Sequence, residues 1–384
     1  MSTVLIACDK FKGSLTAPEV CDAVAEGIRA VRPGANVIPM PIADGGDGTV
    51  AAAVSAGYRH ITASVTGPSG QPVSAGFALH PDGGTAVIEM AQASGLLQLA
   101  GGIPDPLGAT SYGTGELVAA ALDAGARRLV LAVGGSASTD GGAGFLQALG
   151  ARLTAGDGTA VARGGGALDT LASVDFTSLD PRLAGCEIVL ASDVDNPLLG
   201  HDGAASVYGP QKGAGAEEVE ILEEGLAHLV RVMEAQGVLA GMAAFPGSGA
   251  AGGIGYAALA VLGATRQPGI DVVMDITGYR ETVAALGAGD LVVTGEGSLD
   301  LQTLSGKAVA GLAAVARDAG VPVTAVCGQG SLTTEQLDTL GIQGSFRLTD
   351  LEPDTARCMS EAAALLTAVG HHVGNTLAAE RVMT

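Results

Sequence analysis

Short apolar runs alternate along this chain with amphipathic or alanine-rich segments, a pattern typical of α/β proteins. Residues 3–8 predict a strand and residues 36–40 a second one. Between them, residues 17–31 have helical periodicity, and Thr16-Ala-Pro-Glu19 before them is a capping box with a proline in the first turn. The chain therefore begins as a β-α-β unit.

The pattern changes between residues 60 and 90. Apolar runs at 61–65, 73–79 and 86–90 are separated only by Gly-Pro-Ser-Gly and Pro-Asp-Gly-Gly, which leave no room for helices. We expect antiparallel hairpins there.

Strands and helices alternate again in the rest of the chain. The predicted strands are 129–133, 187–191, 290–294 and 321–327, and the predicted helices are 114–125, 216–236, 305–318 and a long C-terminal one. Parallel strands need crossover helices, which both ends of the chain supply and residues 60–90 do not. We therefore expect one discontinuous α/β domain from residues 1–60 and 285–384, with a second α/β domain inserted at 61–284.

Composition narrows the function classes. The chain has 384 residues, of which 47% are hydrophobic and 15% charged, and its net charge is −21. Such acidity argues against nucleic acid and anionic membranes as partners, so a small molecule is expected. The five cysteines are widely spaced, and the sequence shows neither an export signal nor a long apolar segment, so we expect a reduced, cytoplasmic protein. We expect it to be a monomer or a homodimer.

Lysine is scarce and clustered near glycine. The four lysines stand against fifteen arginines, and each lies in or beside a glycine- or serine-containing segment: Lys10, Lys12, Lys212 and Lys307. Ammonium groups beside glycine-rich backbone suit the binding of phosphate, which makes phosphoryl chemistry the first hypothesis. Lys12 and Lys307 are the stronger candidates.

Two glycine-rich loops could present main-chain N–H groups to an anion. The first, residues 134–144, follows a strand and enters a helix, and its candidate residues are Gly134, Gly135, Ser136, Ser138 and Asp140. The second includes Gly249, Gly252 and Gly253. Close packing against a sheet is the alternative for the first loop and an equal competitor for the second.

The known nucleotide motifs are weak or absent. Gly247–Gly252 satisfies the dinucleotide pattern G-x-G-x-x-G but has no clear strand before it. Gly306-Lys307 is followed by alanine, and residue 301 is leucine where a P-loop needs glycine. A Ser-His-Asp arrangement or nucleophile elbow does not emerge, so hydrolase chemistry has little support.

Several carboxylates come directly after predicted strands, where open α/β sheets bind ligands. They are Asp9, Asp44, Asp47, Asp193, Asp195, Glu296 and Asp300. A cluster there can bind Mg²⁺ or accept a proton from a hydroxyl group. Helix capping is a strong rival for Asp44 and Asp47, whereas function is favoured for Asp193 and Glu296.

Seven motifs, in order along nearly the whole chain, resemble the type I glycerate kinases of bacteria. They are Ala7-Cys-Asp-Lys-Phe-Lys-Gly-Ser-Leu15, Ala43-Asp-Gly-Gly-Asp-Gly-Thr49, the loop 134–144, Asp193-Val-Asp-Asn-Pro197, Tyr208-Gly-Pro-Gln-Lys-Gly213, Gly249-Ala-Ala-Gly-Gly253, and Thr294-Gly-Glu-Gly297 with Gly306-Lys307. Two positions depart from the family pattern: Lys10 stands where a serine is usual, and Asp47 replaces a glutamate.

The resemblance implies a flavodoxin-like parallel-sheet domain, a second α/β domain and an active site between them. It also implies phosphorylation of D-glycerate by ATP with Mg²⁺, giving 2-phosphoglycerate in most bacterial members. The two glycine-rich loops, with Lys212, Asp44 and Asp47, would bind nucleotide and substrate. Asp9, Lys12, Asp193 and Lys307 are the candidate catalytic residues, and Asp193, Glu296 and Asp300 the candidate metal ligands.

Three alternatives remain open at this point. The same class of enzyme could act on the 3-hydroxyl group and give 3-phosphoglycerate. A nucleotide-binding oxidoreductase could use residues 247–252 as its fingerprint. A non-catalytic binding protein for small acids is the third.

Overall fold

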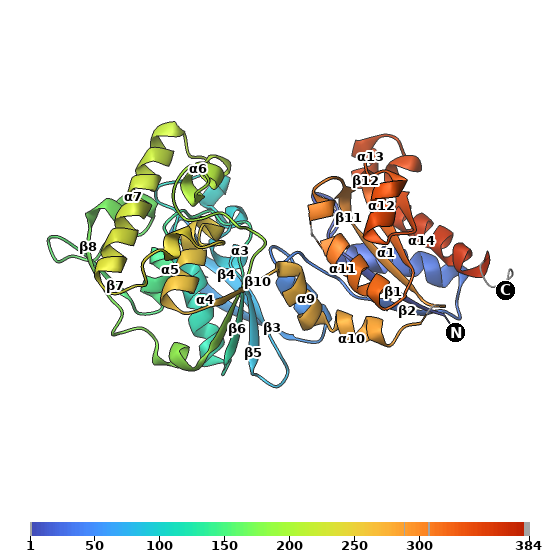
Figure 1. Cartoon of the computed structure of the whole chain (residues 1–384), viewed down its shortest axis with the longest axis horizontal. Helices are drawn as coiled ribbons and strands as arrows, with labels where there is room; N and C mark the ends of the chain where they lie inside the picture. Colours follow the sequence, from blue (N-terminus) through green and yellow to red (C-terminus); the bar gives the residue numbers. More distant parts are fainter. Residues whose placement is uncertain (1, 288, 306–307, 380–384) are drawn as a thin grey trace. The chain divides into compact units, whose positions relative to one another are not determined.

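The computed structural model describes residues 2–287, 289–305 and 308–379 (Figure 1). Its contacts divide the chain into two compact units. The first unit comprises Met1–Asp44, Ala51–Ala56 and Ile270–Thr384, and the second unit comprises Gly45–Val50 and Gly57–Gly269. These units differ from the predicted domains, because residues 270–284 belong to the first unit and not to the inserted domain. The domain boundaries at residues 60 and 285 stay a prediction.

The first unit is built on a five-stranded sheet of order β13-β12-β11-β1-β2, in which every pair is parallel. Its strands are β1 (Thr3–Cys8), β2 (Asn36–Pro39), β11 (Leu291–Leu299), β12 (Val323–Gly330) and β13 (Gly344–Arg347). Numbered along this unit alone, the order is 2-1-3-4-5, that of flavodoxin-like folds. The order changes direction between β1 and β11, so the carboxyl ends of these two strands form the expected ligand site.

Helices cover this sheet on both faces, because alternate side chains of its strands enter different cores. Val4 and Ile6 of β1 pack with α1 and α14, whereas Leu5 and Ala7 pack in a separate cluster with the helices of the other face. The helices of the first unit are α1 (Ala17–Val31), α9 (Gly269–Thr277), α10 (Tyr279–Ala284), α11 (Ala308–Asp318), α12 (Thr334–Leu340), α13 (Thr355–Ser360) and α14 (Ala362–Ala379), with 3-10 turns η9 (Thr303–Ser305) and η10 (Leu348–Asp350). Helix α2 (Thr49–Ser55) crosses the contact boundary.

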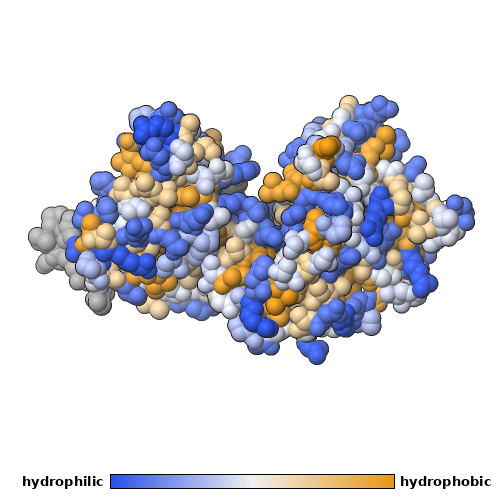
Figure 2. All heavy atoms as spheres, turned by 180° about the vertical axis from the view of Figure 1, so that it is seen from behind, coloured by the Kyte–Doolittle hydropathy of each residue, from blue (hydrophilic) through white to orange (hydrophobic). Residues whose placement is uncertain are grey.

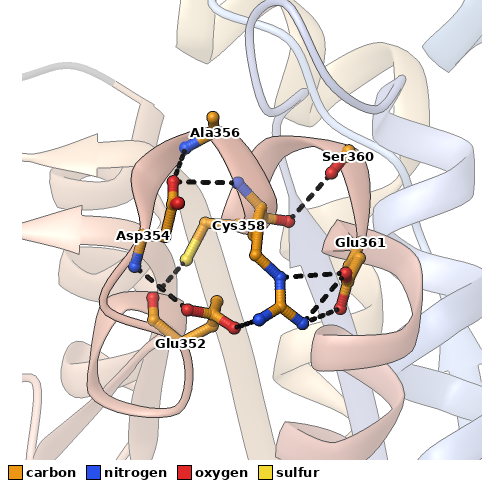
Figure 3. A network of polar contacts seen from close by, with 7 residues as sticks. Glu352, Asp354, Ala356, Cys358, Ser360 and Glu361 are labelled. Atoms are coloured by element: carbon orange, nitrogen blue, oxygen red, sulfur yellow. Dashed lines mark hydrogen bonds and ion pairs between the residues drawn. The ribbon is translucent and has the colours of Figure 1, made fainter.

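The start of α13 shows how polar side chains define a helix end in this unit (Figure 3). Asp354 accepts the main-chain N–H groups of Ala356 and Arg357, as an N-cap should. Arg357 in turn forms ion pairs with Glu352 at 2.9 Å and Glu361 at 3.2 Å. This network ties the loop before α13 to the start of α14.

The second unit contains a six-stranded mixed sheet of order β10-β9-β6-β5-β4-β3. The strands are β3 (Arg59–Thr66), β4 (Pro72–Leu79), β5 (Thr85–Glu89), β6 (Arg128–Ala132), β9 (Glu187–Ala191) and β10 (Thr265–Gln267). Strands β3, β4 and β5 pair antiparallel, which confirms the predicted hairpins, and β5, β6, β9 and β10 pair parallel. The carboxyl ends of these four strands therefore lie at one edge.

Helices and a small antiparallel pair, β7 (Arg152–Ala155) with β8 (Leu171–Asp175), complete the second unit around a large hydrophobic core. The helices are α3 (Ala91–Ser94), α4 (Tyr112–Asp123), α5 (Ala143–Ala148), α6 (Ala204–Tyr208), α7 (Ala216–Ala235) and α8 (Ile254–Tyr256). Shorter turns are η1 (Leu96–Gln98), η2 (Ala100–Gly102), η3 (Gly165–Thr170), η4 (Pro181–Gly185), η5 (Pro210–Lys212), η6 (Met242–Ala244), η7 (Ala250–Gly253) and the π turn η8 (Ala257–Val261).

The structure confirms the α/β prediction, and several element boundaries differ from the predicted ones. Strand β11 runs to Leu299, five residues beyond the predicted end, because β12 continues to pair with it after β1 has ended. Ser305, the first residue of the predicted helix 305–318, belongs instead to the 3-10 turn Thr303–Ser305, and Ala308–Asp318 are helical as predicted.

Hydrophobic side chains on the face drawn in Figure 2 lie scattered among hydrophilic ones. A few large ones, such as Leu97 and Leu239, are well exposed. Within the described part of the chain, the helices are all too short or too polar to span a membrane.

Candidate active site

In the first unit, Asp9 lies directly after β1, where that strand ends beside β11. Its main-chain N–H donates to the carbonyl of Gly295 at 2.8 Å, and its side chain is 13% exposed. The N–H of Lys10 donates to Asp9 Oδ1 at 2.6 Å, and the Lys10 ammonium lies 3.9 Å from the same oxygen. Asp9 is thus held rigidly at the point where the strand order reverses.

Burial and nearby charges together make Asp9 a weak acid. The pKa of Asp9 is raised to about 7, mainly by burial; the charge of Lys10 lowers it, and the negative charges of Asp44 and Glu296 raise it. A carboxyl group that titrates near neutral pH can accept a proton during a reaction, as a general base must.

Glu296 is positioned by strand pairing, which corrects the prediction that it follows its strand. It lies inside β11, opposite Cys327 of β12, one residue beyond the last pair that β11 makes with β1. The Thr303 hydroxyl donates to Glu296 Oε1 at 2.8 Å and also accepts the main-chain N–H of Asp300 at 3.2 Å. The turn that carries Asp300 is therefore linked to Glu296 through one threonine.

Of the two lysines predicted to assist catalysis, the structure describes only Lys12. Lys12 is exposed in the loop between β1 and α1. The backbone of this loop passes close to Gly297, where an added Cβ would lie 3.4 Å from the main-chain nitrogen of Lys12. Lys307 lies outside the described residues. Asp44 is exposed at the end of the segment that follows β2, and its charge reaches Asp9.

In the second unit, Asp193 lies two residues beyond β9, at the edge shared by the parallel strands. Its Oδ1 accepts the N–H of Gly269 at 2.8 Å, and its side chain is exposed. Nearby, Arg266 donates to the carbonyl of Ser192 and forms an ion pair with Asp195 at 2.7 Å. Asp195 is therefore neutralised locally, while Asp193 holds backbone at the end of β10.

The segment Gly45–Val50 packs on the same edge through glycine contacts. An added Cβ on Gly45 would lie 2.3 Å from Gly269, and one on Gly134 would lie 3.0 Å from Gly46. Side chains at these positions would force the backbones apart. Gly45 and Gly134 are thus needed for close packing, and Asp47 itself is exposed.

The loop 134–144 uses much of its hydrogen-bonding capacity internally. Asp140 is fully buried and accepts the main-chain N–H groups of Ser111, Gly142 and Gly144, together with the Ser111 and Thr110 hydroxyls. Burial raises the pKa of Asp140, and these hydrogen bonds act against that rise. The expectation that this whole loop offers N–H groups to phosphate is therefore corrected for its second half, since Gly142 and Gly144 donate to Asp140.

Lys212 is also buried, against the same loop. Its ammonium donates to the Ser138 carbonyl at 2.6 Å and to the Thr139 hydroxyl at 3.4 Å. Burial lowers the pKa of Lys212 to about 7, although the charge of Asp140 acts in the opposite direction. Lys212 is 2% exposed, so its main contacts are with the loop interior.

The second glycine-rich loop packs on the first. Gly252 has a positive φ of 66°, and an added Cβ would lie 2.0 Å from the Ser138 carbonyl oxygen, while its own carbonyl accepts the N–H of Gly141. Gly249 and Gly253 likewise make close backbone contacts, with Pro197 and Gly141. Close packing accounts for these glycines.

The predicted metal ligands do not all belong to one unit: Glu296 and Asp300 lie in the first and Asp193 in the second. Among residues 2–287, 289–305 and 308–379, no three His, Cys, Asp or Glu side chains form a site that could hold a metal by themselves. Mg²⁺ usually needs only one or two carboxylates when substrate phosphates and water supply the other ligands. The carboxyl groups around Asp9 fit that pattern, because their mutual repulsion would be relieved by a cation.

Comparison with known proteins decides the family. Residues 4–378 match the family model described as the glycerate kinase family. The chain belongs to the glycerate kinase family. This confirms the resemblance read from the seven motifs, and it confirms the expectation of an enzyme, since members of this family are kinases.

Relatives and a solved structure agree with this membership. A glycerate kinase of Bacillus subtilis is 44% identical over 90% of each chain, and a glycerate 2-kinase of Escherichia coli K12 is 44% identical over 86% of each chain. The crystal structure of a protein assigned as glycerate kinase 2 from Salmonella typhimurium LT2 matches 99% of each chain with a TM-score of 0.85 and 41% identity.

The oxidoreductase alternative has no structural support in this glycerate kinase family member. The dinucleotide fingerprint requires a strand directly before its first glycine. Residues 247–252 follow the 3-10 turn η6, and β10 comes only after them.

Sequence reasoning missed one residue at the edge of the second sheet. Glu89 is the last residue of β5, is 1% exposed, and accepts the N–H groups of Gly48 at 3.1 Å and Val50 at 3.3 Å on Oε2. Burial raises the pKa of Glu89 to about 7, the Val50 N–H lowers it, and the charge of Asp47 raises it. A glutamate inside the apolar run 86–90 was the available signal.

Proposed function

We propose that this enzyme transfers the γ-phosphoryl group of ATP to the 2-hydroxyl group of D-glycerate, with Mg²⁺, and releases 2-phosphoglycerate and ADP. The observation that supports the 2-position is the 44% identity to a relative named glycerate 2-kinase.

The proposed chemistry needs a proton acceptor, charge neutralisation and alignment. The glycerate 2-hydroxyl oxygen forms a bond to the γ-phosphorus while the bond to the β-phosphate oxygen breaks, and the hydroxyl proton passes to a carboxylate. We assign that role to Asp9, because with a pKa of about 7 it is present in both its protonated and its ionised form at neutral pH. Glu296, with Asp300, is the candidate Mg²⁺ ligand in the first unit, and the metal would offset charge on the phosphates.

The remaining assignments follow from charge and position. Lys12, and Lys307 outside the described residues, are proposed to neutralise the transferring group or the glycerate carboxylate. Asp193 is proposed to orient substrate or metal from the second unit. The first half of loop 134–144, including Gly134, Gly135 and Ser136, is proposed to contact nucleotide. Asp140 and Lys212 stabilise that loop through buried hydrogen bonds.

Product analysis tests the proposal directly. The purified enzyme is incubated with D-glycerate, ATP and Mg²⁺, and the product is examined by phosphorus NMR. We expect the signal of 2-phosphoglycerate. A 3-phosphoglycerate signal would keep the kinase and overturn the position, and absence of any phosphorylated acid beside an active control kinase would overturn the substrate.

A further inference from the structure

Glu89 is buried with one half of its carboxyl group lacking a donor. Oε2 accepts two main-chain N–H groups, from Gly48 and Val50. Oε1 is buried and has no hydrogen-bond donor among the described residues. A buried carboxylate oxygen without a donor is costly, since it loses its hydration and gains nothing in return.

The charged group on the segment packed against Glu89 is another carboxyl, that of Asp47. Both the charge of Asp47 and a side-chain hydrogen bond with it favour the protonated form of Glu89. From the sheet, β6 presents the apolar Ala132 opposite Glu89, and β4 pairs Phe77 with the preceding Ile88. A protonated Glu89 is a hydrogen-bond donor, and the neighbouring carboxyl group of Asp47 can accept from it.

This arrangement bears on the segment Gly45–Val50, which carries Asp47. Glu89 holds its far end at Gly48 and Val50. Asp193 holds Gly269, against which Gly45 at the near end packs. The segment is therefore fixed at both ends to the edge where β5, β6, β9 and β10 finish.

We propose that Glu89 is a positioning residue that is protonated in the active form of the enzyme and shares its proton with Asp47, so that the Asp47 carboxylate is held at the edge of the second sheet during phosphoryl transfer. Glu89 does not touch the reacting atoms in this role; it acts through Asp47 and the Gly45–Val50 backbone. The activity readout below rests on the proposed kinase function, whereas the spectroscopic readout does not.

The decisive comparison is between Glu89→Gln and Glu89→Ala, with Glu217→Gln as the control on an exposed position of the same unit. Glutamine has the shape of a protonated glutamic acid, accepts the same N–H groups and donates toward Asp47. We expect Glu89→Gln to keep kcat/KM within about threefold of the wild type. We expect Glu89→Ala to lose about 10-fold or more, since alanine leaves the N–H groups of Gly48 and Val50 without their acceptor and Asp47 without its partner.

The pH profile separates positioning from mere stability. Raising the pH through the pKa of Glu89 removes its proton, so wild-type kcat/KM should fall on the alkaline side, and Glu89→Gln should lose this alkaline limb. The acid limb, which we assign to Asp9, should remain in both and serves as an internal reference. Equal inactivity of Glu89→Gln and Glu89→Ala, with both folded by circular dichroism, would overturn the proposal, because it would show that an ionised Glu89 is required.

Infrared spectroscopy supplies a readout that does not depend on activity. At pH about 6, below the pKa of Glu89, the wild type should show the carbonyl stretch of a buried carboxylic acid that Glu89→Gln lacks. An identical spectrum for the wild type and Glu89→Gln would overturn the shared proton even if the enzyme phosphorylates glycerate as proposed. If the band is present and glycerate is not phosphorylated, the proposed substrate fails and the protonated Glu89 stands.

Discussion

Two aspartates in glycine-containing segments after strands differ in burial and in the number of hydrogen bonds that they accept. Asp140 in the second unit is fully buried, and its oxygens accept three main-chain N–H groups and two hydroxyls. Asp9 in the first unit is 13% exposed, accepts the main-chain N–H group of Lys10, and lies near two other carboxyl groups. The first fastens a loop, and the second is the carboxyl group to which we assign the role of proton acceptor.

The difference arises from how much backbone surrounds each carboxyl group. At Asp140 the chain turns back through Gly142 and Gly144, so their N–H groups point at the side chain. At Asp9 the neighbouring strand β11 continues past the end of β1 and presents Glu296 instead. At Asp140 nearby glycines in the chain supply the donors, whereas at Asp9 a neighbouring strand supplies a second carboxyl group.

The largest expected effect is on activity at Asp9. Asp9→Asn should lower kcat by about 10²- to 10⁴-fold, because the amide still accepts the Lys10 N–H but cannot accept a proton. Steady-state kinetics measure this, and thermal unfolding should show no loss of stability, since a neutral group is easier to bury. Asp318→Asn, at an exposed ion pair of the same unit, is the control. Near-normal turnover of Asp9→Asn would remove Asp9 from the mechanism.

The next effect is on stability at Asp140. Asp140→Ala should lower the free energy of unfolding by about 3 kcal/mol, since several buried N–H groups lose their acceptor at once. Denaturant titration measures this, beside Asp157→Ala, which removes an exposed acceptor. If Asp140→Ala is as stable as its control but catalytically dead, Asp140 contacts substrate and the contrast with Asp9 disappears.

A third effect concerns the pH dependence of stability at Lys212. Its pKa is about 7 in the folded protein and near the ordinary lysine value when unfolded, so the unfolded chain binds more protons between these values. The wild type should therefore lose stability as the pH falls from about 10 to about 7. Lys212→Met should lack this part of the dependence while keeping the side-chain volume. Parallel pH profiles of unfolding free energy for the two proteins would contradict the buried, neutral lysine.

The smallest effect sharpens the description of Asp9. Lys10→Ser removes the cation that lowers the pKa of Asp9 and keeps the main-chain N–H at Oδ1. The acid limb of the kcat/KM profile should move to higher pH by about one unit or less. A shift to lower pH would mean that Asp9 is not the group responsible for that limb.

Much of the fold could be predicted from the sequence because its signals are local. Strand β9 begins and ends at the predicted residues, and α1 begins after the capping box at Thr16. The end of β11 could not be predicted, since only pairing with β12 keeps residues 296–299 extended. The candidate site residues divide in the same way into local and non-local signals. Asp9 and Asp193 could be named because they follow strands. Glu89 was missed because its hydrogen-bond partners lie about forty residues away in the chain.

By itself the sequence determined the alternation of strands and helices, the glycine positions that permit close approach, and membership of the glycerate kinase family. These depend on residues that are neighbours in the chain or on motifs preserved in order. Tertiary structure alone decided which carboxyl groups are buried and which are exposed. Burial and the supply of N–H donors set the pKa of Asp9, Glu89 and Asp140, and both depend on strand order and packing between segments far apart in the chain.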